Sequence, residues 1–128
     1  MKILRKGETP RYERDNIISY LLVSEKTCGS KNLTTTIVEM QPGGIQKMHS
    51  HGPEQMYYVL EGEGAMVVGD ETEIVGAGDC IFIPSNAPHG LENRGTFLLR
   101  YVSAASPSFG REETERFWPL NSMKDEQE

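Results

Sequence analysis

Two stretches decide the fold, GGIQKMHSHGPEQMYYVLEG at residues 43–62 and GDCIFIPSNAPHGLEN at residues 78–93, and together they hold all three histidines of the chain. His49 and His51 stand two residues apart at the start of a β region, where alternate side chains point to the same face. Both imidazoles can therefore point at one ion. His89 follows an apolar run and a proline-containing turn, and a neighbouring strand can deliver it to the same place.

The rest of the chain is typical of a β protein. Glycine and proline interrupt it at short intervals, and the apolar and β-branched runs between them are too short for ordinary helices. Many short strands at close spacing predict a sandwich or barrel, because closing a sheet removes its exposed edges. The expected strands are Ile17–Val23, Leu33–Met40, Met56–Glu61, Gly64–Val68, Glu71–Val75, Cys80–Ile83 and Phe97–Val102.

Composition excludes several classes of protein. A length of 128 residues with 37% hydrophobic residues fits one globular domain. The net charge of −6 leaves no excess of lysine and arginine to bind a phosphate backbone, so we expect no nucleic-acid partner. With neither a secretory signal nor an apolar run of membrane-spanning length, we expect a cytoplasmic protein with no membrane partner. Cys28 and Cys80 form no CxxC pair, which predicts two free thiols.

The two ends differ from this middle. Residues 1–14 are rich in lysine and arginine, and we expect them to form an N-terminal arm. We expect the barrel at residues 15–105 and an acidic C-terminal tail at residues 106–128. In the tail, Arg111–Phe117 predicts a short helix that stops before Pro119, after which the chain frays. Three apolar side chains there can cover a face of the barrel: Phe117, Trp118 and Leu120.

The spacing within the two histidine-containing stretches resembles the two signature motifs of the cupin family. The matching positions are Gly43, His49, His51, Gln55 and Gly62 in the first motif, and Gly78, Pro84, His89 and Asn93 in the second. The resemblance implies an all-β double-stranded β-helix, or jelly roll, of the small single-domain, cupin 2 type. It also implies metal ligands at the histidines and at the acidic position of the first motif. Because this barrel hosts many unrelated activities, the fold does not name one.

Two positions depart from the family pattern. Asn86 replaces a glycine of the second motif, and asparagine also adopts left-handed turn geometry. Gln55 replaces the glutamate of the first motif, with Glu54 just before it. Gln55 and Tyr57 share one face of the expected strand. If that face is the inner one, the Gln55 carbonyl oxygen is the fourth ligand; otherwise Glu54 binds through a shifted loop, or Gln55 only hydrogen-bonds nearby.

A site of three imidazoles and one amide favours a particular chemistry. Neutral ligands leave the full charge on a divalent ion, which favours an anionic small molecule. They suit Mn, Fe, Ni, Co or Zn, with Mn or Fe as the first candidates. The set is similar to that of pectin-degradation cupins and of manganese cupins with hydroxynitrile lyase activity. This resemblance implies a Lewis-acid isomerase, lyase or decarboxylase acting on a small carbonyl, carboxylate or sugar acid. The alternatives are an Fe(II)-dependent dioxygenase and a non-catalytic ligand-binding barrel.

Further side chains are candidates for the site. Arg100, if it points inward, makes a bidentate clamp for a carboxylate; otherwise it is a solvated residue or part of an interface ion pair. Tyr57 is either a catalytic acid or base or a packing residue. We expect Phe82 and Leu91 to form the pocket wall.

The expected strand Met56–Glu61 is apolar on both faces. An outward apolar face needs cover, either from the tail or from a second subunit. Because single-domain cupins commonly form two-fold dimers, we expect a homodimer.

Overall fold

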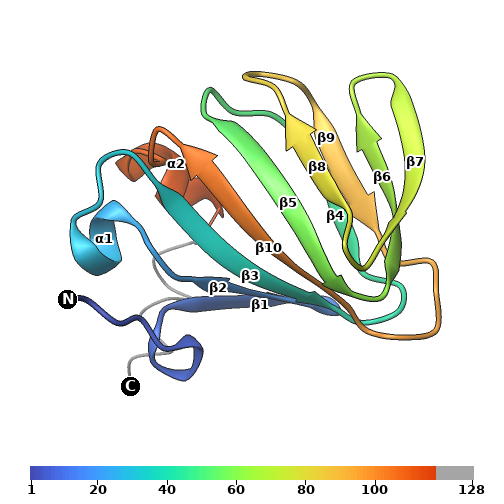
Figure 1. Ribbon diagram of the computed structural model, residues 1–128, viewed down its shortest axis with the longest axis horizontal. Coiled ribbons are helices and arrows are strands. Elements are labelled where there is room, and N and C mark those ends of the chain that lie inside the picture. The colour runs from blue at the N-terminus through green and yellow to red at the C-terminus, as the bar shows by residue number, and fades with distance from the viewer. Residues whose placement is uncertain (118–128) are drawn as a thin grey trace.

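Ten β-strands make up about half of residues 1–117, the part of the chain that the structure, a computed structural model, describes (Figure 1). The strands lie in a six-stranded sheet of order β1-β2-β3-β10-β5-β8 and a four-stranded sheet of order β4-β9-β6-β7, and all paired strands are antiparallel. The strands are β1 (Arg11–Arg14), β2 (Ile17–Leu21), β3 (Thr34–Met40), β4 (Ile45–His49), β5 (Glu54–Glu61), β6 (Glu63–Val68), β7 (Glu71–Gly76), β8 (Cys80–Ile83), β9 (His89–Glu92) and β10 (Leu99–Ser106).

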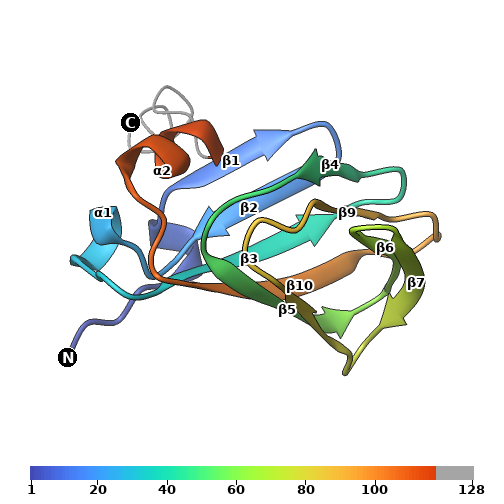
Figure 2. The same cartoon turned by 90° about the horizontal axis from the view of Figure 1, so that it is seen from above.

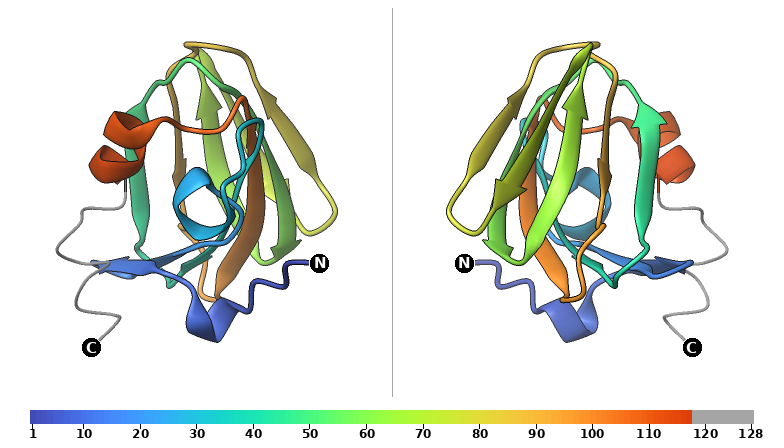
Figure 3. Two further views of the ribbon diagram at one scale, coloured as in Figure 1. Left: turned by 90° about the vertical axis from the view of Figure 1, so that its left-hand side faces the viewer. Right: turned by 90° about the vertical axis from the view of Figure 1, so that its right-hand side faces the viewer.

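The inner faces of the two sheets enclose the core (Figures 2 and 3). Side chains alternate across a strand, and β3 shows the result, since its residues alternate between buried and half-buried from Thr34 to Met40. Strand β10 alternates in the same way. Most of the buried apolar side chains form one cluster that spans both sheets: Ile17, Val38, Met40, Tyr57, Val59, Met66, Val75, Ile83, Leu91, Leu99 and Tyr101. A smaller cluster contains Leu21, Ala105 and Phe109. The architecture is the jelly-roll barrel that the sequence predicts.

Most of the expected strands are present, and three strands were not expected. Strands β4 and β9 carry the first and the last histidine, and they are only five and four residues long. Strand β1 lies inside the segment assigned to the N-terminal arm. It pairs with β2 from Arg11 opposite Tyr20 to Arg14 opposite Ile17. The sheet therefore begins at Arg11 rather than after residue 14.

Motif positions other than the histidines shape the backbone. Asn86 has a φ of 65°, so it takes the left-handed conformation that the sequence predicts for this turn. Gly62 has a φ of +83°, and a Cβ there would collide with the carbonyl oxygen of Leu98. The buried amide of Asn93 donates to the carbonyl oxygens of Met40 and Phe97, each at 2.9 Å. These residues hold turns together and leave the interior to other side chains.

Three short helices complete the described chain: the 3-10 helix η1 (Lys6–Glu8), α1 (Glu25–Cys28) and α2 (Arg111–Phe117). Helix α2 has the predicted bounds, and its Arg116 donates to the backbone carbonyl oxygen of Ser50, the residue after β4, at 3.4 Å. The predicted cover by Phe117, Trp118 and Leu120 and the predicted fraying concern side chains and residues outside the described ones. Within residues 1–117, none of the helices combines the length and the apolar character needed to span a membrane. Both cysteines are free and exposed.

Candidate metal centre

The three histidines meet inside the barrel, although they come from two separate stretches of sequence. His49 ends β4, and His89 begins β9 directly opposite it in the antiparallel pair. His51 follows two residues later, in the connection to β5. The ring centroids of His49 and His51 lie 4.2 Å and 4.9 Å from that of His89. One ligand atom from each residue lies within 4.8 Å of the other two, so the three side chains are positioned to hold a single ion.

Backbone contacts fix how each imidazole is presented. The Nδ1 atoms of His49, His51 and His89 lie 2.9–3.0 Å from backbone carbonyl oxygens, those of Lys47, Pro53 and Ala87 respectively. A carbonyl only accepts, so a neutral ring carries its hydrogen on Nδ1 and its lone pair on Nε2. The Nε2 atom of His89 is buried and has no hydrogen-bond partner among the described residues. The donor set therefore fits a cation.

Gln55 adds an oxygen to the same cluster. Strand β5 turns Gln55, Tyr57 and Val59 inward and leaves Glu54 exposed, which confirms the predicted faces of this strand. The Gln55 Oε1 atom lies 2.8 Å from His51 Nε2, and its amide nitrogen donates to the Ser103 hydroxyl at 3.4 Å. That bond orients the amide oxygen toward the histidines. Glu54 points away, so the shifted-loop alternative is not what the structure shows.

Burial favours the neutral form of His49 and His89. It is the largest influence on the pKa of His89, which it lowers to about 4, and the neighbouring His49 and His51 lower it further. Burial also lowers the pKa of His49. A neutral imidazole is the form that binds a metal ion. At neutral pH His49 and His89 therefore present lone pairs.

A cavity of about 300 Å³ opens beside the histidines. Its described lining contains three cationic side chains, Arg14, Lys47 and Arg116, and no carboxylate. Phe109, after β10, covers His51 with its ring at a centroid distance of 4.9 Å. The size suits a small molecule, and the charge of the lining suits an anion.

Tyr57 lies in the cavity wall, with its ring centroid 6.1 Å from that of His89. Burial, followed by the neighbouring Tyr101, raises its pKa well above the ordinary value. The phenol is therefore protonated at neutral pH, which fits a donor better than a base. A catalytic role for Tyr57 stays a prediction.

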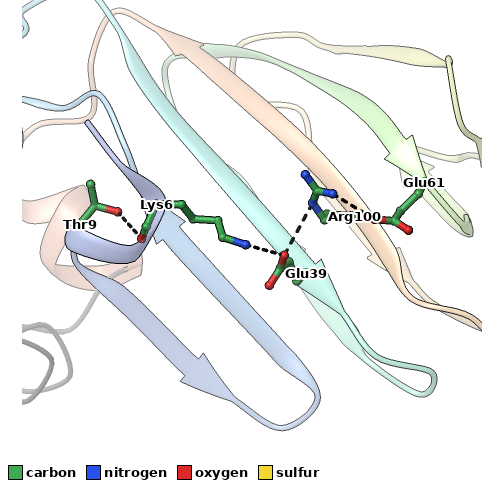
Figure 4. Close-up of polar contacts among 5 residues, drawn as sticks. All are labelled: Lys6, Thr9, Glu39, Glu61 and Arg100. Atoms are coloured by element: carbon green, nitrogen blue, oxygen red, sulfur yellow. Dashed lines mark hydrogen bonds and ion pairs between the residues drawn. The ribbon is translucent and has the colours of Figure 1, made fainter. Parts of the chain in front are cut away.

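Arg100 does not clamp a substrate. The prediction required it to point inward, but Leu99 and Tyr101 take the inner face of β10, and alternation sends Arg100 outward. There its guanidinium lies 3.0 Å from Glu61 and 3.6 Å from Glu39 (Figure 4). Arg100 is therefore part of an ion pair on the outer face of the sheet.

The prediction for Phe82 is also wrong. Phe82 pairs with Met56 across β5 and β8 and points outward, with 60% of its surface exposed. Ile83, the next residue, takes the inner face. Leu91 is buried in the core cluster and does not line the cavity.

Sequence reasoning missed the cationic residue Arg14, which lies in the cavity wall with Tyr12. Both were assigned to an arm outside the barrel. The signal was present in the sequence, because Tyr12 and Arg14 are two residues apart just before the strand Ile17–Leu21. Two residues at that spacing share a face when they lie in a strand.

Comparison with known proteins agrees with this geometry. A family model, Cupin_2, described as a cupin domain, matches residues 36–104, which is more than half of the chain and includes all three histidines. The chain belongs to the cupin family. A predicted oxalate decarboxylase from Thermotoga maritima has the same fold, with a TM-score of 0.73 and 24% identity over 83% of this cupin and 99% of that chain.

Curated relatives cover only part of this cupin's length. It is 39% identical over 74 residues to an uncharacterised protein of Methanocaldococcus jannaschii, a match that covers 57% of this chain and 59% of that protein. It is 30% identical over 96 residues to the oxalate decarboxylase of Bacillus subtilis, covering 69% of this chain and 23% of that enzyme. The chain thus spans less than two thirds of either relative.

Proposed function

We propose that this cupin binds one divalent transition metal, with Mn or Fe as the first candidates, through His49, His51, His89 and Gln55. We further propose that it is a Lewis-acid enzyme of the decarboxylase, lyase or isomerase type that acts on a small carboxylate. One observation carries the proposal. Three imidazole nitrogens and one amide oxygen converge at the edge of a cavity whose described lining holds no carboxylate.

The contact between His51 and Gln55 supports a cation that lies beside both side chains. With the hydrogen of His51 on Nδ1, its Nε2 lone pair faces the Gln55 Oε1 atom at 2.8 Å. Two acceptors at this distance repel each other unless a positive charge lies beside both. The buried Nε2 atom of His89 is in a similar position, because an unsatisfied buried polar group costs about 1–3 kcal/mol. A bound ion would satisfy all three atoms.

The protein's own residues then determine which molecule enters. Neutral ligands do not neutralise a divalent ion, so an anion is favoured beside it. Arg14, Lys47 and Arg116 add positive charge around the cavity. A bound metal ion supplies Lewis acidity, polarising an oxygen of the substrate. Tyr57, kept protonated by burial, is placed in the wall to donate a hydrogen bond or a proton.

The named relatives suggest the first compound to test. The Bacillus subtilis relative is an oxalate decarboxylase, and oxalate is a small anion that fits a cavity of about 300 Å³. We therefore choose oxalate as the first substrate candidate. Longer carboxylates and sugar acids follow it in the screen.

Metal content is the decisive measurement. We would purify the protein without a histidine tag and measure bound metals by plasma mass spectrometry, alongside His49→Ala, Gln55→Ala and the control Arg100→Met, which alters only the outer face. The expected result is about one equivalent of a transition metal in the wild type and the control, its loss in His49→Ala, and weaker retention in Gln55→Ala. A folded wild type that refuses Mn, Fe, Ni, Co and Zn would overturn the proposal.

Turnover tests the second half of the proposal. Loaded protein should convert a small carboxylate under strictly anaerobic conditions. Conversion that requires and consumes oxygen would instead identify the dioxygenase alternative, and a tightly bound carboxylate recovered unchanged would identify a binding protein.

A further inference from the structure

Arg14 is a half-buried arginine in the wall of the histidine-lined cavity. It ends β1, and its guanidinium reaches across the neighbouring strand to the hydroxyl of Ser19 at 3.2 Å. It also donates to the side-chain oxygen of Gln46 and stacks over the ring of Tyr12 at 5.0 Å. Each of these partners is neutral. Among the described residues, no carboxylate pairs with Arg14.

Arg14 differs from Arg100 because, among the described residues, no carboxylate pairs with it. Arg100, on the outer face, is held between the carboxylates of Glu39 and Glu61. Arg14 is also withdrawn from water, and burial lowers the pKa of its guanidinium. Moving a charge out of water without an opposite charge is unfavourable. An arginine in this state is poised to bind an anion.

The guanidinium has capacity left for a ligand. Arginine has five N–H donors in a rigid fork that matches a carboxylate, and the bonds to Ser19 and Gln46 engage the two terminal nitrogens once each. Those bonds also hold the side chain in one orientation. A fixed donor loses less conformational entropy when it binds a ligand than a free one does.

Gln46 links this arginine to the histidines. It lies on β4 three residues before His49. Arg14, Gln46 and His49 line the same cavity. The two other cations of the lining, Lys47 and Arg116, are exposed to solvent, where water screens their charge.

We propose that Arg14 binds a second acidic group of the ligand whose first acidic group lies at the histidine cluster, so that the cavity selects small dianions over monoanions. The proposal rests on the proposed function and narrows its substrate class to dicarboxylates and similar dianions. Arg14 is then a specificity-determining residue on a strand that lies outside both histidine motifs.

Calorimetric binding tests the assignment without requiring turnover. Manganese-loaded wild type, Arg14→Met, Arg14→Lys and the matched control Arg100→Met are titrated with three dianions, oxalate, malonate and succinate, and with the monoanions formate, acetate and propionate. We expect Arg14→Met to bind its best dianion about 10- to 100-fold more weakly, the range for a charge-assisted hydrogen bond. Affinity for monoanions should change less than about threefold.

The other variants decide between specificity and structure. Arg14→Lys keeps the charge but not the fork and should recover part of the dianion affinity, whereas Arg100→Met should bind like the wild type. An unchanged preference for dianions in Arg14→Met would overturn the proposal. So would an equal loss for both classes of anion in a variant whose thermal melt and metal content match the wild type.

Failure of this inference is distinguishable from failure of the proposed function. A wild type that binds no metal defeats the proposed function. The same titrations on metal-free protein still report the Arg14 contact, because a dianion that touches the guanidinium loses affinity in Arg14→Met with or without an ion. A metal-loaded wild type that binds acetate and malonate equally well defeats only the role of Arg14.

Discussion

We expect acid to destabilise the metal-free protein because the imidazole of His89 is fully buried. Its pKa is lowered from 6.5 to about 4 in the folded state, chiefly by burial. Between these two values the unfolded chain holds a proton that the folded chain does not. The free energy of unfolding therefore falls as the pH drops through this window, and this loss levels off below about pH 4. At about 1.4 kcal/mol per pKa unit, the full shift of His89 corresponds to about 3.5 kcal/mol, of which about 2–3 kcal/mol is lost by pH 4.5.

Urea denaturation of chelator-treated protein measures this effect. The free energy of unfolding would be determined from pH 7.5 to pH 4.5 for the wild type and for His89→Gln, which removes the titrating group. The carboxylates titrate in both proteins, so the difference between the two slopes isolates His89. The wild type should lose about 2–3 kcal/mol more than the variant. Parallel pH profiles would refute the idea that His89 is buried as a neutral base.

Added manganese extends the same experiment. A ligand that binds only the folded protein stabilises it by mass action, and protons compete with the ion for the imidazoles. The loaded wild type should therefore be more stable at pH 7.5 and lose more stability on acidification than the metal-free protein. His89→Gln should gain less from the metal.

Three further changes have defined outcomes. Gln55→Glu places a negative charge beside the histidines, so it should raise metal affinity and lower oxalate affinity at least about tenfold by calorimetry. Phe82 lies opposite Met56 on the outer face of β5 and β8, and we propose this apolar face as the interface of the expected homodimer. Phe82→Asp should therefore change sedimentation from dimer to monomer, and a monomeric wild type would contradict this. Gly64→Ala places a Cβ 2.7 Å from Leu99 Cδ2 and should cost about 1–3 kcal/mol in urea melts, whereas Gly7→Ala, with open space around it, should cost little.

The histidine cluster was predictable because its signals are local. His49 and His51 are only two positions apart and so lie close together, although His51 lies beyond the end of β4. The alternation along β5 separates Gln55 from Glu54 whatever the rest of the fold does. The position of His89 needed the family spacing, because β9 is only four residues long and pairs with a distant strand. Period-two patterns carry little information over four residues.

Alternation divides a strand into two faces without saying which one is buried. On β10 the sequence separates Arg100 from Leu99 and Tyr101, and the apolar pair takes the core. Alternation alone left both orientations of Arg100 open, and the clamp required the inward one. Phe82 shows the opposite case. It is strongly apolar and still faces outward, because Ile83 fills the interior position on a four-residue strand.

Arg14 was beyond the reach of local patterns for a different reason. Its segment is basic, which is typical of a solvated arm, and only the pairing of β1 with β2 brings it to the cavity. The net charge of the chain also gave no indication of a cationic cavity. The chain carries a formal charge of −6, yet the described lining of its cavity holds three cations and no carboxylate. Because salt screens charges beyond about 8 Å at physiological ionic strength, the residues around the cavity, and not the sum over the chain, determine which ligand is bound.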